Sequence, residues 1–198
     1  MVLLQPFQRL RSLVLIFGLL QAPTAGAALA AEVGGVNVPE TFVVDRQTLH
    51  LNGAGLRQVP ILGIGIYVAA LYLPVPSHDA SAIAALPGPK AIILHFLHDA
   101  SKAQVEGQFR KGERINCGDG ECSKSDLPDF EHLVMSSPAV SVGDTSTYIY
   151  EPKRLRVLAN GNLIGDYADA DLSSQLLKGF IGPHPPTEAL KRALLGLQ

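Results

Sequence analysis

The sequence contains no tryptophan, only two cysteines and few charged residues. Aromatic residues make up 6% of the 198 residues and charged residues 17%, with a formal net charge of −2. No block of lysine or arginine points to a nucleic-acid partner, and no acidic run points to a disordered tail. Hydrophobic residues reach 47%, which is enough apolar material for the full core of one domain.

The first 30 residues have the three parts of a secretory signal peptide. Arg9 and Arg11 form a positively charged start, an apolar segment spans 13–20, and Ala28-Leu29-Ala30 is an A-x-A cleavage pattern. We expect cleavage after Ala30, which leaves residues 31–198 as a periplasmic or secreted domain. The alternative is an uncleaved anchor, but the apolar segment is much shorter than the roughly 20 residues that cross a bilayer. No integral membrane segment is therefore expected after processing.

Export would place the two cysteines in an oxidising compartment, where disulfides persist. Cys117 and Cys122 are separated by four residues, two of them glycine, so they can close a small loop. We predict a disulfide between them, with two free thiols as the alternative. The spacing does not match a redox C-x-x-C motif and supplies only half of a four-cysteine zinc site. The sequence therefore predicts no metal site and no cofactor.

The most informative stretch is an apolar run of about fourteen residues from Pro60 to Leu73. It is too short to cross a bilayer, and its β-branched residues favour a buried strand. In an extended chain, side chains alternate between faces, so Gly63, Gly65 and Tyr67 should share one face. Such a bare strip beside an aromatic ring lets a ligand come close. Ordinary packing of a helix over the glycines is the alternative.

The rest of the chain predicts short strands linked by hairpins, with helices between and after them. Hairpin turns are expected at Asn52-Gly53 and Asn160-Gly161. Strands are expected at 41–44, 48–51, 54–59, 90–97, 145–150, 155–159 and 163–167, and helices at 79–86, 101–114, 126–136, from 169 or 171 to about 180, and 187–195. This pattern predicts an α+β fold, an antiparallel sheet with helices packed on one face.

The segment Gly55-Leu56-Arg57, followed by G-I-G-I-Y-V-A-A-L-Y-L, resembles the chalcone isomerase superfamily, and most of all its bacterial, secreted chalcone isomerase-like branch. Other pieces of the resemblance are Gly143-Asp144, Asn160-Gly161 and the C-terminal stretch from Gly179 to Gly196. Together they cover essentially residues 35–196. The resemblance implies an open-faced β-sandwich: a large antiparallel sheet covered by helices, with a ligand cleft between the two layers.

The resemblance also carries an implied chemistry, which this sequence matches only in part. In chalcone isomerases, the arginine of G-x-R holds a phenolate while hydrogen-bond donors polarise a ketone. Arg57 matches the arginine, but Leu62 stands where the family has a threonine. No tyrosine or asparagine lies between Asp99 and Gln108, where the family supplies further donors. Chalcone cyclisation is therefore not predicted.

The superfamily also includes members that resemble fatty-acid-binding proteins, in which the arginine holds a carboxylate. Burying an unpaired guanidinium is costly, so Arg57 needs an anionic partner, either a ligand or an internal acid. We therefore expect a secreted, non-catalytic domain that binds a small amphipathic anion such as a fatty acid. The predicted ligand-binding residues are Arg57, Leu62, Gly63, Gly65 and Tyr67. The alternatives are an isomerase (intramolecular lyase) with an unknown substrate, and an envelope partner or structural protein.

The leader and the disulfide can be tested by one intact mass after expression with export. Cleavage after Ala30 removes Arg9 and Arg11, leaving 14 basic and 18 acidic residues and a net charge of −4. A Cys117–Cys122 bond lowers the mass by about two units, because two thiol hydrogens are lost. A mass that still includes the first 30 residues would contradict cleavage. A mass that a reducing agent leaves unchanged would contradict the disulfide.

Overall fold

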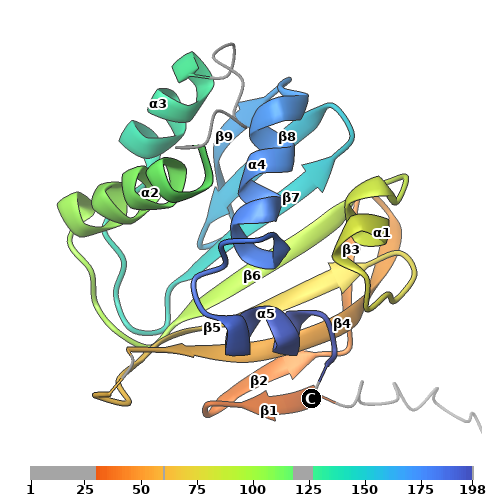
Figure 1. Cartoon of the computed structure of the whole chain (residues 1–198), viewed down its shortest axis with the longest axis horizontal. Helices are drawn as coiled ribbons and strands as arrows, with labels where there is room; N and C mark the ends of the chain where they lie inside the picture. The colour runs from red at the N-terminus through yellow and green to blue at the C-terminus, as the bar shows by residue number, and fades with distance from the viewer. Residues whose placement is uncertain (1–29, 60, 118–126, 198) are drawn as a thin grey trace, which may run out of the picture.

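A computed structural model of the protein describes residues 30–59, 61–117 and 127–197. Its main element is a seven-stranded antiparallel sheet in the order β3-β4-β5-β6-β7-β8-β9, so each strand pairs with its neighbours along the chain (Figure 1). The strands are β3 (Thr41–Val44), β4 (Gln47–Gln58), β5 (Gly65–Leu73), β6 (Lys90–Phe96), β7 (Thr145–Glu151), β8 (Arg154–Ala159) and β9 (Asn162–Tyr167). The predicted antiparallel α+β architecture is confirmed.

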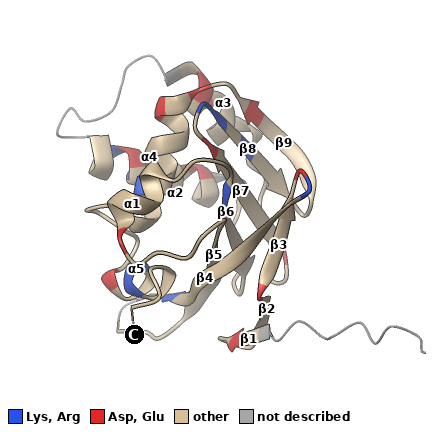
Figure 2. Cartoon of the chain, turned by 90° about the vertical axis from the view of Figure 1, so that its right-hand side faces the viewer, with Lys and Arg blue, Asp and Glu red and all other residues tan. Residues whose placement is uncertain are grey.

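Helices pack on one face of this sheet (Figures 1 and 2). They are α1 (Ala80–Ala85), α2 (Lys102–Cys117), α3 (Leu127–Ser136), α4 (Ala170–Ile181) and α5 (Glu188–Leu194). The apolar cluster between helices and sheet, here called the helix-side core, includes Leu71, Leu133, Leu172 and Leu190. None of the helices that the structure describes is long and apolar enough to cross a membrane.

The caps of three helices follow the predicted sequence signals. The Asp79 carboxylate accepts hydrogen bonds from Ser81 N and Ala82 N at the start of α1. Asp169 and Thr187 cap α4 and α5 in the same way. Each cap satisfies backbone donors that have no partner inside the helix. The helices therefore begin close to the predicted residues.

The opposite face of the sheet is covered by a small hairpin for which no strands were predicted. Strands β1 (Ala30–Val33) and β2 (Val36–Pro39) pair with each other through Gly34 and Gly35, whose φ angles are 56° and 80°. Glycine adopts such positive φ angles without steric cost, as a tight hairpin requires. The hairpin-side core includes Val38, Val68 and Ala70.

The sheet is strongly curled. Arg156 of β8 forms an ion pair with Asp45 in the β3–β4 turn, although β4 and β8 stand four places apart in the strand order. The same arginine lies 3.4 Å from Glu151 of β7. The hydrogen bond from Arg156 holds the pKa of Asp45 below its usual value. The β3–β4 turn is thereby tied to the far part of the sheet.

The predicted hairpin turn at Asn52-Gly53 is wrong, because β4 runs unbroken through it. A register shift between Leu51 and Gly53 marks a β-bulge instead. The Asn52 side chain donates to Leu194 O at 2.8 Å and accepts from Ser77 N at 2.7 Å. Both the nitrogen and the oxygen of the Asn52 amide are thus bonded to distant parts of the chain, and a bulge forms in place of a turn.

Replacing Gly53 should destabilise the fold through its contact with α5. A Cβ atom at Gly53 would lie 2.0 Å from Ala193 O, which belongs to the helix backbone and cannot move alone. We expect Gly53→Ala to lower the free energy of unfolding by about 2–3 kcal/mol, measured by urea denaturation.

Gly107 in α2 is the matched control, because a Cβ there meets no atom within 4 Å. Gly107→Ala should leave stability unchanged or raise it by up to about 1 kcal/mol, since alanine favours a helix interior. Equal stability of Gly53→Ala and the unmodified protein would contradict direct packing of α5 on β4.

Candidate functional site

Arg57 is the third member of a row on the helix-side face of β4. Gly53, Gly55 and Arg57 alternate along the strand, and the two glycines face α5. A Cβ at Gly55 would lie 2.6 Å from the Ala193 Cβ, so glycine here permits close approach of the helix. Gly53 lies against the C-terminal end of α5, and Gly55 lies closer to Leu190 of the same helix. Arg57 is the next residue of β4 on this face, so the strand runs from Gly55 to Arg57 in the direction of the N-terminal end of α5.

The guanidinium of Arg57 lies over an aromatic ring. Arg57 pairs with Tyr67 across β4 and β5, and its Cζ atom is 5.4 Å from the Tyr67 ring centroid, within cation–π distance. The arginine is half-buried, and Tyr67 is only 6% exposed. Among the described residues no ion pair involves Arg57. The cation therefore has a ring face beside it and no carboxylate partner in the described fold.

Further aromatic rings extend from Tyr67 into the helix-side core. Tyr67 contacts Phe96 of β6 edge to face at 6.1 Å, and Tyr148 of β7 contacts Phe180 of α4 at the same centroid distance. Tyr148 also stacks on Tyr150 at 6.5 Å. The buried Tyr150 hydroxyl has no hydrogen-bond partner among the described residues. A buried polar atom without a partner is unusual in folded proteins and is a candidate contact for a bound molecule.

The tyrosines near Arg57 are held in their protonated form. Burial raises the pKa of Tyr67 to about 12, although the neighbouring Arg57 cation acts in the opposite direction. Burial also raises the pKa of Tyr148 and Tyr150, and the nearby phenols add to both shifts. At neutral pH all three hydroxyls therefore carry a proton that can be donated in a hydrogen bond.

The structure separates the other predicted site residues from this pair. The predicted strand from Pro60 begins only at Gly65, and Pro60 itself lies outside the described residues. Leu62 and Gly63 belong to a turn before the strand, in which the Leu62 side chain is 68% exposed and Gly63 has a φ of 65°. Extended geometry was assumed too early along the chain, so the predicted alternation does not hold there.

A β-bulge also changes the face of Gly65. Arg57 pairs with Tyr67, but Gln58 pairs with Gly65, so the residue between them, Ile66, has no partner. A Cβ at Gly65 would meet Leu56 and Leu97, which pack against the hairpin-side core. Gly65 and Tyr67 thus face opposite sides of the sheet, and the predicted shared face is wrong. The structure brings together Arg57 and Tyr67 but not Leu62, Gly63 or Gly65.

Sequence reasoning missed several neighbours of the pair. The contact of Gly53 and Gly55 with α5 was not predicted, because Asn52-Gly53 has the composition of a turn, although the G-x-G-x-R alternation places both glycines on one strand face with Arg57. The predicted strand at 145–150 places Tyr148 and Tyr150 on one face but gives no sign that they lie near Tyr67. Phe96 and Phe180 carry no local signal, because their contacts depend on how β6 and α4 meet the other strands.

The cysteine prediction remains open. Cys117 is the last residue of α2, and Cys122 lies outside the described residues. The predicted disulfide therefore stays a prediction. Among the described residues, no group of three or more His, Cys, Asp or Glu side chains could hold a metal ion.

Comparison with known proteins gives a family match and a structural neighbour. A family model described as chalcone isomerase-like matches residues 30–196. A fatty-acid binding protein of Arabidopsis thaliana has a similar fold, with a TM-score of 0.64 at 18% identity, over 81% of this chain and 92% of that one. At that identity the likeness concerns the fold. A search of curated proteins gave no match.

The buried tyrosines predict a loss of stability at high pH. Their pKa values lie above 10.0 in the folded state, so the folded protein holds its phenolic protons more tightly than the unfolded chain. The contribution of these tyrosines to the free energy of unfolding should therefore be constant below about pH 10 and fall as the pH rises towards 12. Urea denaturation at a series of pH values measures this fall.

Removing one such tyrosine should reduce the loss of unfolding free energy at high pH. Tyr67→Phe deletes one group with a raised pKa, so the slope should decrease by about 1.4 kcal/mol per pH unit between pH 10 and 12. An unchanged slope in Tyr67→Phe would mean that Tyr67 is not protected by burial.

Proposed function

Because the chain belongs to the chalcone isomerase-like family, we propose that it is a binding domain for a small amphipathic acid, such as a fatty acid. Arg57 and Tyr67 hold the carboxylate, and the neighbouring apolar and aromatic side chains of the helix-side core receive the chain of the ligand. A few convergent polar groups in an apolar surround are the usual form of a small-molecule site.

The observation that carries the proposal is the half-buried Arg57 without a carboxylate partner among the described residues. A guanidinium removed from water needs an anion, and a carboxylate matches its planar donors. A cation–π contact with Tyr67 compensates only part of that requirement. A ligand carboxylate supplies the rest, and the Tyr67 hydroxyl can add a neutral hydrogen bond.

The Arabidopsis fatty-acid binding protein with the same fold supports an acidic, lipid-like ligand. The isomerase alternative is less well supported, because Leu62 cannot donate a hydrogen bond and its side chain is exposed on a turn. An envelope partner protein whose site is filled by its own side chains is the remaining alternative. Export through a cleaved leader is part of the proposal, so the protein would bind its ligand in the periplasm or outside the cell.

Native mass spectrometry of the exported protein tests the proposal. We expect a co-purifying acid, or binding of added decanoate, in the unmodified protein. Arg57→Ala should weaken decanoate binding at least tenfold, about 1.4 kcal/mol, because a charge-assisted pair is lost. Arg57→Lys keeps the charge but not the paired donors, so its binding should be intermediate.

Arg114→Ala is the matched control, since Arg114 is exposed on α2. It should bind decanoate as the unmodified protein does. Equal binding by Arg57→Ala and Arg114→Ala would contradict anchoring at Arg57. Absence of any bound acid in all of these proteins would favour the partner-protein alternative.

A further inference from the structure

The turn between β4 and β5 exposes three large aliphatic side chains. The exposed fractions are 104% for Ile61, 68% for Leu62 and 43% for Ile64; these three residues are called the apolar tip. Figure 1 shows this turn projecting from one end of the sheet, clear of α2 and α5. Isolated exposed aliphatic residues are common, but three within four residues form a contiguous apolar patch of the kind that marks an interaction site.

The apolar tip has a defined backbone. Val59 N donates to Ile64 O at 2.9 Å, and Gly63 N donates to Val59 O at 3.1 Å. The Gln58 side chain donates to Gly63 O at 3.4 Å. The turn is therefore closed by its own hydrogen bonds, and its aliphatic side chains point outward from a fixed frame.

The conformation of Ile61 is costly to the protein. Its φ is 73°, a left-handed value that a β-branched residue rarely adopts. Glycine would relieve this strain, and the fully exposed side chain contributes no packing in return. Backbone strain at a residue that does not contribute to folding indicates that its side chain makes contacts with another molecule.

We propose that the apolar tip inserts into the surface of a lipid bilayer and brings the Arg57 site to the source of its ligand. The choice of a bilayer rests on the proposed function, because a fatty acid is held in membranes. Residues 58–77 contain no Asp, Glu, Lys, Arg or His, so insertion desolvates no charge in this stretch. The tip begins within a few residues of Arg57, so docking places the site at the membrane.

The size and chemistry of the apolar tip fit a bilayer better than a protein partner. A stable protein interface buries about 800 Å² on each side and has a polar rim, which three aliphatic side chains on a projecting turn cannot supply. The same side chains, placed shallowly in lipid, give weak and reversible attachment.

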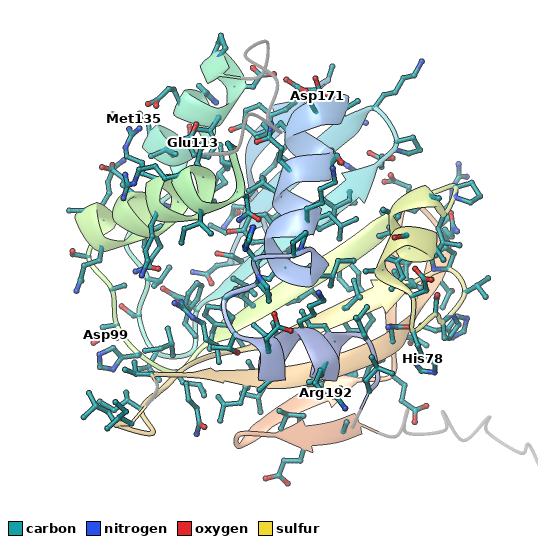
Figure 3. The ribbon with its side chains drawn as sticks, in the orientation of Figure 1. His78, Asp99, Glu113, Met135, Asp171 and Arg192 are labelled. Carbon is teal, nitrogen blue, oxygen red and sulfur yellow. The ribbon has the colours of Figure 1, made fainter. Side chains whose placement is uncertain are left out.

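An acidic group, Asp99, lies at the same end of the molecule as the β4–β5 turn (Figure 3). Its carboxylate accepts a hydrogen bond from Val142 N at 2.8 Å. A negative charge there does not favour anionic lipid. We therefore expect attachment to neutral lipid with little dependence on salt.

The lack of tryptophan allows a direct test of insertion. Leu62→Trp creates a single fluorescent reporter in the apolar tip, because the chain has no other Trp. With phosphatidylcholine vesicles, its emission should shift to shorter wavelength and be quenched by brominated lipid. Val43→Trp is the control, since Val43 is 60% exposed and pairs with Thr48 at the opposite end of β4. Equal responses of the two reporters, or none at Leu62, would overturn the proposal.

Vesicle sedimentation gives a second measurement that uses the natural side chains. Replacing Ile61, Leu62 and Ile64 together by Ser should lower partition into phosphatidylcholine vesicles at least about tenfold. Val43→Ser should leave partition unchanged. Absence of vesicle binding by the unmodified protein, or equal binding by the triple variant, would overturn the proposal. Loss of a dimer in the triple variant without vesicles would also overturn it, because the tip would then be a contact between copies.

Failure of docking can be distinguished from failure of the binding site. Without vesicles, the triple Ser variant should bind decanoate as the unmodified protein does, whereas Arg57→Ala should lose decanoate binding and keep vesicle partition. If no protein bound decanoate while partition still depended on the tip, the proposed ligand would be wrong and bilayer docking would stand.

Discussion

The contact of α5 with the bare backbone of β4 organises the part of the molecule that contains Arg57 and Tyr67. Gly53 and Gly55 leave no side chain on that face, so the helix lies directly on the strand. The Asn52 amide ties the same bulge to Leu194 O at the end of the helix. Arg57 is next on that face and lies over the Tyr67 ring. A side chain on Gly53 or Gly55 would push α5 away from β4.

Most of the secondary structure could be predicted from the sequence, because its signals are local. Asp79, Asp169 and Thr187 begin helices, and Asn160-Gly161 makes a hairpin turn with φ angles of 48° and 77°. The errors concern non-local contacts. Asn52-Gly53 has the composition of a turn, but the contacts of Asn52 with Leu194 and Ser77 stabilise a bulge instead.

The candidate site could be predicted only in outline. Arg57 and Tyr67 are ten residues apart, and only the pairing of β4 with β5 places them together. The face of Gly65 differs from the predicted one because a single unpaired residue, Ile66, reverses the alternation. No pattern in one strand reveals such a bulge, since it depends on the register with the partner strand. The aromatic neighbours depend in the same way on how distant elements meet.

The packing of α5 on β4 also bears on the order in which the molecule is completed. The sheet strands pair with their neighbours in the chain, so β3 to β9 can assemble through contacts between consecutive strands. The contact between Gly53 and Ala193 instead joins segments about 140 residues apart. The part of the β4 face that carries Gly53 and Gly55 is thus covered only when α5 docks on it. The helix-side face of β4 is therefore among the later parts of the fold to be completed.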